Sequence, residues 1–333
     1  MRSAAPRSCP QPARALARKF FQGRLFTSPV PVNKPTPLRP GGRIAVIAPA
    51  GFVEEADLQA GVGAIRDQGF EVEWRAPILA RKGYLAGDEN ARAGDLIEYF
   101  RRDDIDAIFC ARGGFGSVQL LPILARERSL PAKIFAGYSD ITMLLNWLLQ
   151  HRHMVTFHAP MVAMDLARGL AGRTKEQFWG TLTGTVRNWQ TKLGAVIRPG
   201  VSAGEMMGGC LSLLVTTLGT PYEIDTRGKI LFLEDVGEKP YRIERMLIHL
   251  QQAGKLRDLA GVVFGDFTHC EGGDSRDLRQ IAGELFREAQ YPVVLGLAAG
   301  HGAENLALPF GVKMLLDGDG SDASLALTES PVA

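Results

Sequence analysis

The chain has 333 residues, enough for one large domain or two of ordinary size, and 46% of them are hydrophobic, so it can bury a substantial core. The formal net charge of +2 hides an uneven distribution, because residues 1–43 carry nine Lys and Arg and no acidic residue. In the rest of the chain 29 basic residues face 36 acidic ones, a net charge of −7. This balance argues against a nucleic-acid-binding face, and we expect no nucleic-acid partner.

Residues 1–40 form a basic leader, for which the sequence predicts a disordered extension or an over-long gene start. The leader is rich in Arg, Pro and Ala, and its short apolar pairs are interrupted by Gln22, Gly23 and Arg24. A secretory signal has a continuous apolar centre, so it fits poorly. An organelle transit-like segment remains an alternative, since such segments are Arg-rich and poor in acids. Because no stretch of about 18 apolar residues follows, we expect no membrane-spanning helix.

Residues 41–165 alternate patterns typical of strands and helices, which predicts a parallel, doubly wound sheet. Strands are expected at 44–48, 70–74 and 105–111, with a fourth ending at Gly137, and helices at 56–68 and 91–102. No G-x-G-x-x-G motif follows the first strand, so a dinucleotide site is not expected.

The fourth predicted strand ends in Gly137-Tyr138-Ser139-Asp140, and residues 141–149 then read as a helix. A serine on a tight strand-to-helix turn is exposed beside backbone N–H groups that can stabilise negative charge. Ser139 is therefore a candidate nucleophile. Ser-Asp is also an ordinary helix cap, which is the alternative interpretation.

Residues 166–203 are more polar and glycine-containing and read as a linker between two domains, while 204–328 alternate short strands with one amphipathic helix at 241–253. Glu234 lies near the end of an apolar strand, and His301 follows another strand-like run. Reactive groups in open α/β folds gather beyond the carboxyl ends of strands. A hydroxyl, a carboxylate and an imidazole together suit acyl transfer through a serine intermediate.

These residues lie in blocks that resemble the murein L,D-carboxypeptidase family, cytoplasmic serine peptidases with a Ser–Glu–His triad. The resemblance covers roughly residues 40–328. Its blocks are 43–51 (RIAVIAPAG), 112–117 (RGGFGS), 137–142 (GYSDIT), 156–161 (TFHAPM), 233–236 (LEDV), 240–245 (PYRIER), 300–302 (GHG) and 306–311 (LALPFG).

The resemblance implies an α/β protein in two parts. The first would be a flavodoxin-like, class I glutamine amidotransferase-like doubly wound sheet over 41–165, and the second a β-rich swivelling β/β/α domain over 204–328. The catalytic triad would be Ser139, Glu234 and His301, assembled between the two parts. Adjacent strand residues point to opposite faces, so only one of Glu234 and Asp235 can reach the site, and resemblance selects Glu234.

Several further residues are candidates around this triad. The glycine-rich segment 112–117 lacks the lysine of a phosphate-binding loop, so we expect the N–H groups of Gly114 and Asp140 to form an oxyanion hole. A tight turn is the alternative. Arg112 suits recognition of a free carboxylate, or else a structural ion pair. His158 could line the site or pack in the core.

One position departs from the family pattern. The family has Gly-Gly-Asn-Leu where residues 208–211 read Gly-Gly-Cys-Leu, so Cys210 replaces an amide near the substrate-binding site with a weaker hydrogen-bonding thiol. The four cysteines form no C-x-x-C pair, which fits a reducing compartment and argues against a disulfide framework or structural zinc. These are Cys9, Cys110, Cys210 and Cys270.

A second group of polar residues could be drawn as a metal site, but loop residues this close in sequence are more often solvated, and we expect no metal. The group is His269, Cys270, Glu271 and Asp274.

The resemblance implies a cytoplasmic homodimer that releases D-alanine from murein tetrapeptides in peptidoglycan recycling, without a cofactor. Two other functions stay open. Related proteins cleave peptidyl-nucleotide antibiotics of the microcin C type in self-immunity, and a binding protein could retain the cleft for murein fragments without catalysis.

Overall fold

The computed structural model describes residues 31–170, 172–272, 276–319 and 322–333, and the leader over residues 1–30 lies outside this range. Residues 32–40, also assigned to the leader from sequence, lie against the folded body. Asn33 forms a β-bridge with Met154, and the Leu38 N–H donates to the Leu182 carbonyl. Leu38 is almost fully buried, so the folded body begins earlier than the sequence predicted.

The first of two sheets has six strands in the order β12-β5-β4-β3-β1-β2. Its parallel strands follow the order 2-1-3-4-5, which is common among doubly wound sheets. The strands are β1 (Arg43–Ile47), β2 (Glu71–Glu73), β3 (Ala107–Cys110), β4 (Ile134–Gly137), β5 (Thr156–His158) and the antiparallel β12 (Leu308–Phe310).

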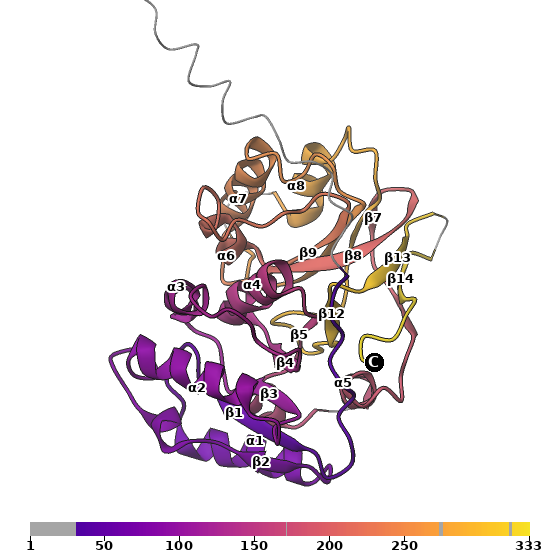
Figure 1. Ribbon diagram of the computed structural model, residues 1–333. Coiled ribbons are helices and arrows are strands. Elements are labelled where there is room, and N and C mark those ends of the chain that lie inside the picture. Colours follow the sequence, from indigo (N-terminus) through magenta and orange to yellow (C-terminus); the bar gives the residue numbers. More distant parts are fainter. Residues whose placement is uncertain (1–30, 171, 273–275, 320–321) are drawn as a thin grey trace, which may run out of the picture. The chain divides into compact units, whose positions relative to one another are not determined.

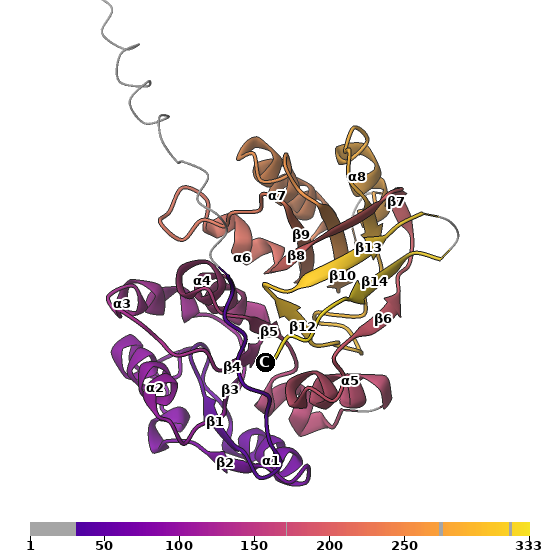
Figure 2. The same cartoon turned by 45° about the vertical axis from the view of Figure 1, so that its right-hand side comes forward.

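Helices cover both faces of this sheet (Figures 1 and 2). Phe135 of β4 stacks on Phe100 of α2, while Phe109 of β3 packs edge-on against Phe178 of α5. Because Phe135 is in register with Ile108, Phe109 points to the opposite face. The helices are α1 (Glu55–Arg66), α2 (Glu89–Arg101), α3 (Leu121–Leu124), α4 (Thr142–Arg152) and α5 (Gly172–Thr183), with 3-10 turns at Ala76–Leu79, Ser117–Leu120 and Ser139–Ile141 and a π-helical turn at Val162–Leu166.

The second sheet has eight strands in the order β6-β14-β13-β8-β9-β10-β11-β7. Strands β8 to β11 are parallel, and the outer strands pair antiparallel to them. The strands are β6 (Trp189–Lys192), β7 (Val196–Arg198), β8 (Val201–Cys210), β9 (Lys229–Val236), β10 (Gly261–Thr268), β11 (Val293–Leu295), β13 (Lys313–Asp317) and β14 (Ser324–Leu327). The helices of this part are α6 (Leu211–Thr216), α7 (Pro240–Gln252) and α8 (Leu278–Leu285).

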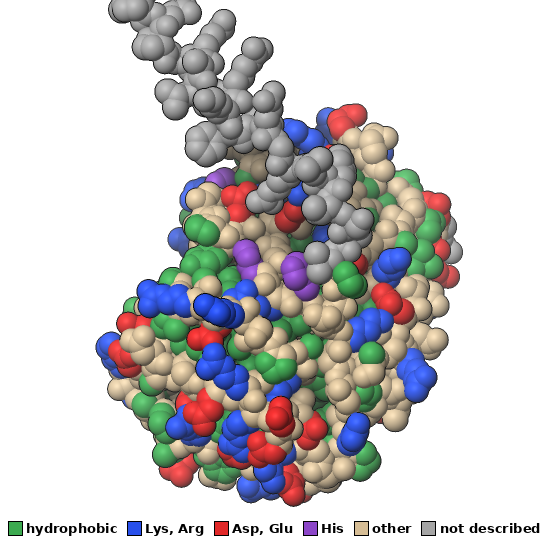
Figure 3. Space-filling model, in the orientation of Figure 1, with side chains coloured by type: hydrophobic (Ala, Val, Ile, Leu, Met, Phe, Trp, Pro, Cys, Tyr) green, Lys and Arg blue, Asp and Glu red, His purple; other side chains and the backbone are tan. Residues whose placement is uncertain are grey.

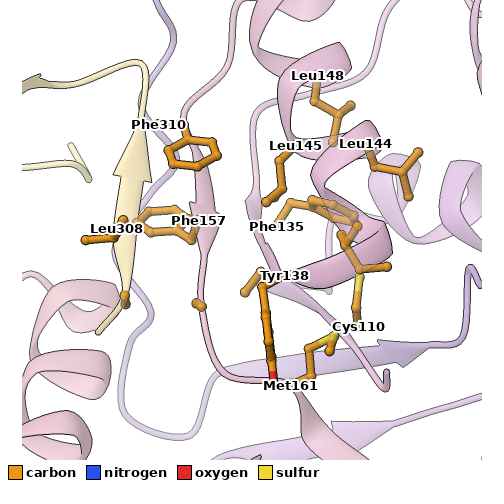
Figure 4. Packing of buried hydrophobic residues seen from close by; sticks show 14 of the residues in the cluster. Cys110, Phe135, Tyr138, Leu144, Leu145, Leu148, Phe157, Met161, Leu308 and Phe310 are labelled. Carbon is orange, nitrogen blue, oxygen red and sulfur yellow. The ribbon is translucent and has the colours of Figure 1, made fainter. Parts of the chain in front are cut away.

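Two features of this topology differ from the sequence prediction. The segment 166–203, expected as a linker, contains α5 and the two outermost strands of the second sheet, β6 and β7. Strand β12, expected within the second domain, instead extends the first sheet at β5, and Figure 4 shows Leu308 and Phe310 beside Phe157. Late residues of the chain therefore complete the sheet that early residues begin.

Side-chain hydrogen bonds join the two sheets close to the predicted nucleophile. Asn146 on α4 donates to the Gly208 carbonyl over 2.7 Å and accepts from the Gly208 N–H over 3.2 Å. The Cys210 N–H donates to the Thr142 hydroxyl over 3.1 Å. The contact is close because Gly209 has no side chain, and a Cβ there would lie 2.5 Å from the Thr142 oxygen. Strand β8 is thereby held against the start of the helix that follows Ser139.

The face seen in Figure 3 mixes acidic and basic side chains, with no large area of one sign. Within the described residues, the helices are all too short or too polar to cross a membrane.

Candidate active site

Ser139 lies at the abrupt turn between β4 and α4, as the sequence predicted. Its φ of 61° is in the left-handed region, which is uncommon for a residue other than glycine. The side chain remains partly exposed, although the residues on both sides of it are buried. A strained, accessible serine between a strand and a helix has the geometry of a nucleophile elbow.

The glycine-rich segment packs directly against this turn. A Cβ on Gly113 would lie 2.8 Å from the Ser139 oxygen and 3.2 Å from the Asp140 nitrogen, so only glycine allows this approach. Gly114 follows with a φ of 111°. Its N–H donates to no acceptor within the described part of the chain. The peptide after Gly113 is thus beside the serine oxygen with a free donor.

Asp140 and Ser117 lock these two segments together. The Asp140 carboxylate accepts from the Ser117 N–H over 2.8 Å, and the Ser117 hydroxyl donates to the Asp140 carbonyl over 2.5 Å. Both residues are almost completely buried, and burial raises the pKa of Asp140. Ser117 begins the 3-10 turn Ser117–Leu120, directly after the glycines.

Arg92, which the sequence analysis missed, holds the same loop from the other side. Its guanidinium is only 4% exposed and donates to the carbonyls of Pro49 and Gly116 and to the Gln119 side chain. A buried cation with three acceptors fixes the end of β1 and the glycine-rich segment at one spacing. The helix pattern of 91–102 could reveal that Arg92 occurs early in α2, but not that it points inward.

Glu234 and His301 form the second half of the candidate site. His301 Nδ1 lies 2.7 Å from Glu234 Oε2, and Glu234 is fully buried. Burial alone would lower the pKa of His301, but the hydrogen bond and charge of Glu234 outweigh it, so the pKa is raised. A Cβ on Gly300 would lie 2.8 Å from Glu234, so glycine is required where the histidine loop passes the carboxylate.

The ring of Tyr138 connects the two halves. It meets the His301 ring edge-on with centroids 4.9 Å apart, and its hydroxyl donates to Asp165 over 3.3 Å. Figure 4 shows Tyr138 near Met161, whose N–H donates to the other Asp165 oxygen over 2.9 Å. His301 is therefore positioned next to the residue that precedes the serine.

His158 has no exposed surface. Its ring packs against Phe232 and Tyr138, and neither ring nitrogen has a hydrogen-bond partner among the described residues. Burial lowers its pKa to about 3, so it is neutral. Of the two sequence interpretations the complete burial of His158 favours packing, and its contact with substrate stays a prediction.

Asp235 points away from His301, to the other face of β9, as the alternation of strand residues predicted. Its carboxylate accepts from the Ser212 N–H over 2.7 Å and lies 3.4 Å from the Cys210 sulfur. Cys210 is itself 5% exposed and is in register with Glu234 across the β8–β9 pair. Its thiol is thus turned into a small polar cluster, and burial raises its pKa.

Arg112 has no acidic partner in the structure. Its guanidinium donates to the Phe52 carbonyl over 3.2 Å, and no carboxylate of the described residues lies within 4.0 Å of it. The alternative of a structural ion pair is therefore not observed. The cation lies beside Gly51 and near the glycine-rich segment, where it is available to an anionic ligand.

The remaining sequence candidates do not form a site. In the described part of the chain no three His, Cys, Asp or Glu side chains are grouped to hold a metal ion. Asp274, one of the four residues considered for such a site, lies outside the described residues.

These features define a class of protein: a two-sheet α/β protein with a strained serine on the first sheet and a buried Glu–His pair on the second. Comparisons with known proteins place it further. Residues 44–159 match the model of the LD-carboxypeptidase N-terminal domain, and residues 203–316 match that of the C-terminal domain. The chain belongs to the LD-carboxypeptidase family.

Its relatives are similar over most of their length. The chain is 38% identical to a protein of Bacillus subtilis named "Probable murein peptide carboxypeptidase", with 85% of this chain and 91% of that one covered. It is 33% identical to the murein tetrapeptide carboxypeptidase of Pseudomonas aeruginosa over 84% and 94% of the two chains. The microcin C7 self-immunity protein MccF of Escherichia coli is 26% identical over 84% and 90%.

A solved structure agrees with the fold. The muramoyltetrapeptide carboxypeptidase of Oxalobacter formigenes superimposes with a TM-score of 0.78 at 31% identity, covering 87% of this chain and 100% of that one. The family resemblance noted from sequence is thereby confirmed.

Proposed function

We propose that the protein is a serine-type L,D-carboxypeptidase that releases D-alanine from murein tetrapeptides in peptidoglycan recycling. The observation that carries the proposal is a strained Ser139 directly after Tyr138, whose ring meets that of His301, together with the 2.7 Å separation of His301 Nδ1 from the buried Glu234. The names of the Bacillus and Pseudomonas relatives support the substrate class.

In this mechanism Ser139 attacks the carbonyl carbon of the scissile bond. Since Glu234 engages Nδ1 of His301, Nε2 is the nitrogen that takes the serine proton. A C–O bond forms to the serine, the C–N bond breaks, and His301 returns the proton to the leaving amine. Water then attacks the acyl-enzyme by the same route and frees the serine.

Two further roles follow for neighbouring residues. The N–H groups of Gly114 and Asp140 would stabilise the oxyanion, and each such donor contributes about 3 kcal/mol in comparable enzymes. Arg112, which lacks an acidic partner within the described residues, would bind the C-terminal carboxylate that distinguishes a carboxypeptidase substrate. Contact of Cys210 with substrate stays a prediction, since its thiol contacts Asp235 and Ser212 rather than His301.

The test is release of D-alanine from L-Ala-γ-D-Glu-meso-diaminopimelyl-D-Ala, measured by mass spectrometry. We expect release by the unmodified protein and a loss of about 10³-fold or more in Ser139→Ala. Ser129→Ala is a matched control, because Ser129 is exposed and lies outside the contacts described for the site. No release by the folded, unmodified protein would contradict the murein assignment.

The likeness to MccF gives a second candidate function, cleavage of a peptidyl-nucleotide antibiotic. Cys210 replaces the amide usual in the family, and this is the reason to retain antibiotic cleavage as a candidate. The two activities would share the triad and differ in the residues of the substrate pocket. Cleavage of a microcin C-type compound without cleavage of the tetrapeptide would favour this alternative. If a fluorophosphonate probe failed to label Ser139, the third possibility, a binding protein without catalysis, would be favoured instead.

We also propose that the enzyme acts as a cytoplasmic homodimer. The three described cysteines are unpaired and buried, which suits a reducing compartment. Exposed Tyr241 and Ile248 on α7 are apolar surface that a second copy could cover. Light scattering of the purified protein at two concentrations would give the mass of the assembly, and a monomer at both would contradict the dimer.

A further inference from the structure

Asp266 is a carboxylate beside the candidate triad that the mechanism does not use. It lies in β10, where the pairing with β9 shifts between Phe264 and Phe267. Since these residues pair with Leu233 and Asp235, two residues of β10, Gly265 and Asp266, stand opposite the single residue Glu234. This is a β-bulge, a feature that redirects a side chain and often occurs next to active sites.

The bulge places the carboxylate against the histidine loop. A Cβ on Gly302 would lie 2.1 Å from an Asp266 oxygen, so the absence of a side chain after His301 lets the carboxylate lie against the histidine loop. The Asp266 N–H donates to the Ala299 carbonyl over 3.0 Å, which fixes the backbone on the other side of His301. The carboxylate is thus held at the site by its own strand and by the loop.

No cation neutralises Asp266. Within the described residues, no Lys, Arg or His nitrogen lies within 4.0 Å of its oxygens. Glu304, whose charge acts on Asp266, is exposed and pairs over 3.0 Å with Arg173. Burial is the main cause that raises the pKa of Asp266 to about 6; the charge of Glu304 adds to this effect, and the charge of His301 acts against it. A cation bound next to Asp266 would stabilise its ionised form, and so offset both the cost of burying the charge and the repulsion from Glu304.

We propose that Asp266 binds the side-chain ammonium group of the residue before the scissile bond, so that the enzyme prefers peptides with a diamino acid there. This inference rests on the proposed function and adds a residue that sets its specificity. The site then carries two opposite charges from different sheets: Arg112 after β3 for the terminal carboxylate, and Asp266 in β10 for the ammonium group. A zwitterionic peptide bound across Ser139 and His301 would place its carboxylate at Arg112 and its ammonium group at Asp266.

Two synthetic tetrapeptides test this, L-Ala-γ-D-Glu-L-Lys-D-Ala and the same peptide with L-norleucine for lysine. The pair differs only by an ammonium group. For the unmodified protein we expect kcat/KM to be higher for the lysine peptide than for the norleucine peptide, on the order of 10-fold or more. This is the effect expected of one hydrogen bond to a charged group. In Asp266→Asn the ratio of the two kcat/KM values should fall to about 1 through KM.

Glu304→Gln is the matched control, since it removes a nearby exposed carboxylate that already has a partner. We expect it to leave the ratio unchanged. Equal loss for both peptides in Asp266→Asn, through kcat, would overturn the proposal and show that Asp266 acts on His301. A ratio near 1 in the unmodified protein would also overturn it.

A binding measurement tests the role of Asp266 independently of the proposed carboxypeptidase function. If neither peptide is cleaved, calorimetric titration of Ser139→Ala with the same two peptides still reports recognition. Tighter binding of the lysine peptide, lost in Ser139→Ala/Asp266→Asn, would support Asp266 even though the carboxypeptidase assignment had failed. Equal affinity of Ser139→Ala for both peptides would contradict it.

Discussion

Glu234 acts on His301 through one buried hydrogen bond, and this sets the pH range in which the imidazole can accept a proton. In the proposed mechanism the neutral ring is the base, so activity should fall as the pH drops through the pKa of His301. Because Glu234 raises that pKa, the fall in kcat/KM should begin at a higher pH than for an ordinary histidine.

Glu234→Gln should therefore lower the pKa of His301 and move the acidic limb of the kcat/KM profile to lower pH. It should also reduce kcat by about 10³- to 10⁴-fold, since the amide no longer stabilises the imidazolium. A pH profile of D-alanine release measures both effects. An acidic limb that stays in place while kcat falls would contradict the assigned role of Glu234 in setting this pKa.

Asp235→Asn is the matched comparison at the neighbouring position. Its carboxylate contacts Ser212 and the Cys210 sulfur rather than His301. We expect its acidic limb to shift far less than that of Glu234→Gln. A larger shift in Asp235→Asn would mean that the assignment of the two faces of β9 is wrong.

At the scale of elements, Arg92 links α2 to the glycine-rich segment 112–117, which carries the proposed oxyanion donor Gly114. One arm of the guanidinium fork, Nη1, donates to both the Pro49 and Gly116 carbonyls while the other, Nη2, donates to Gln119, and a lysine ammonium cannot match this spread of donors. The helix thus sets the position of Gly114 relative to Ser139 without touching substrate, and Arg92 is a positioning residue.

Arg92→Lys should lower the free energy of unfolding by about 1–3 kcal/mol, because a buried carbonyl loses its partner. It should reduce kcat more than it raises KM, since the oxyanion donors act in the transition state. Urea denaturation and steady-state kinetics measure these. Added guanidinium ion at millimolar concentration should partly restore kcat in Arg92→Ala.

Arg101→Lys on the same helix is the control. Arg101 is 60% exposed and pairs with Glu127 at the surface, so we expect little change in stability or kcat. If Arg92→Lys changed stability and kcat as little as Arg101→Lys, the buried contacts of Arg92 would not support the glycine-rich segment.

Local sequence patterns predicted the elements that carry the proposed triad. Around Ser139, for example, an apolar strand pattern is followed at once by a helix pattern. They could not predict the direction of buried polar side chains such as Arg92, which depends on acceptors distant in sequence. The bulge at Asp266 is equally hidden, since it exists only as a mismatch between two paired strands. Short polar strands such as β6 resemble loops until their partners are known.

At the scale of the whole molecule, the contact between α4 and β8 links the two halves of the proposed triad. Asn146 satisfies both backbone groups of Gly208 with one side chain, and Thr142 accepts from Cys210 two residues later. Ser139 precedes α4, and Glu234 is paired with the end of β8. The distance between nucleophile and base therefore depends on this contact.

Asn146→Ala should destabilise the protein by about 2–4 kcal/mol, since it leaves two buried backbone groups of Gly208 unpaired. It should also lower kcat by loosening the alignment of Ser139 with His301. Thermal unfolding and D-alanine release test this. Asn90→Ala, at an exposed position of α2, is the control and should change neither beyond a small capping effect.

Strand β12 has a consequence for the order in which activity can arise during synthesis. Residues 308–310 leave the ribosome after Ser139, Glu234 and His301 have all been made, yet they close the open edge of β5. A nascent chain that already contains every catalytic group still lacks a finished first sheet. Hydrolysis should therefore begin only on near-complete translation, so that unfinished chains do not cleave peptides in the cell.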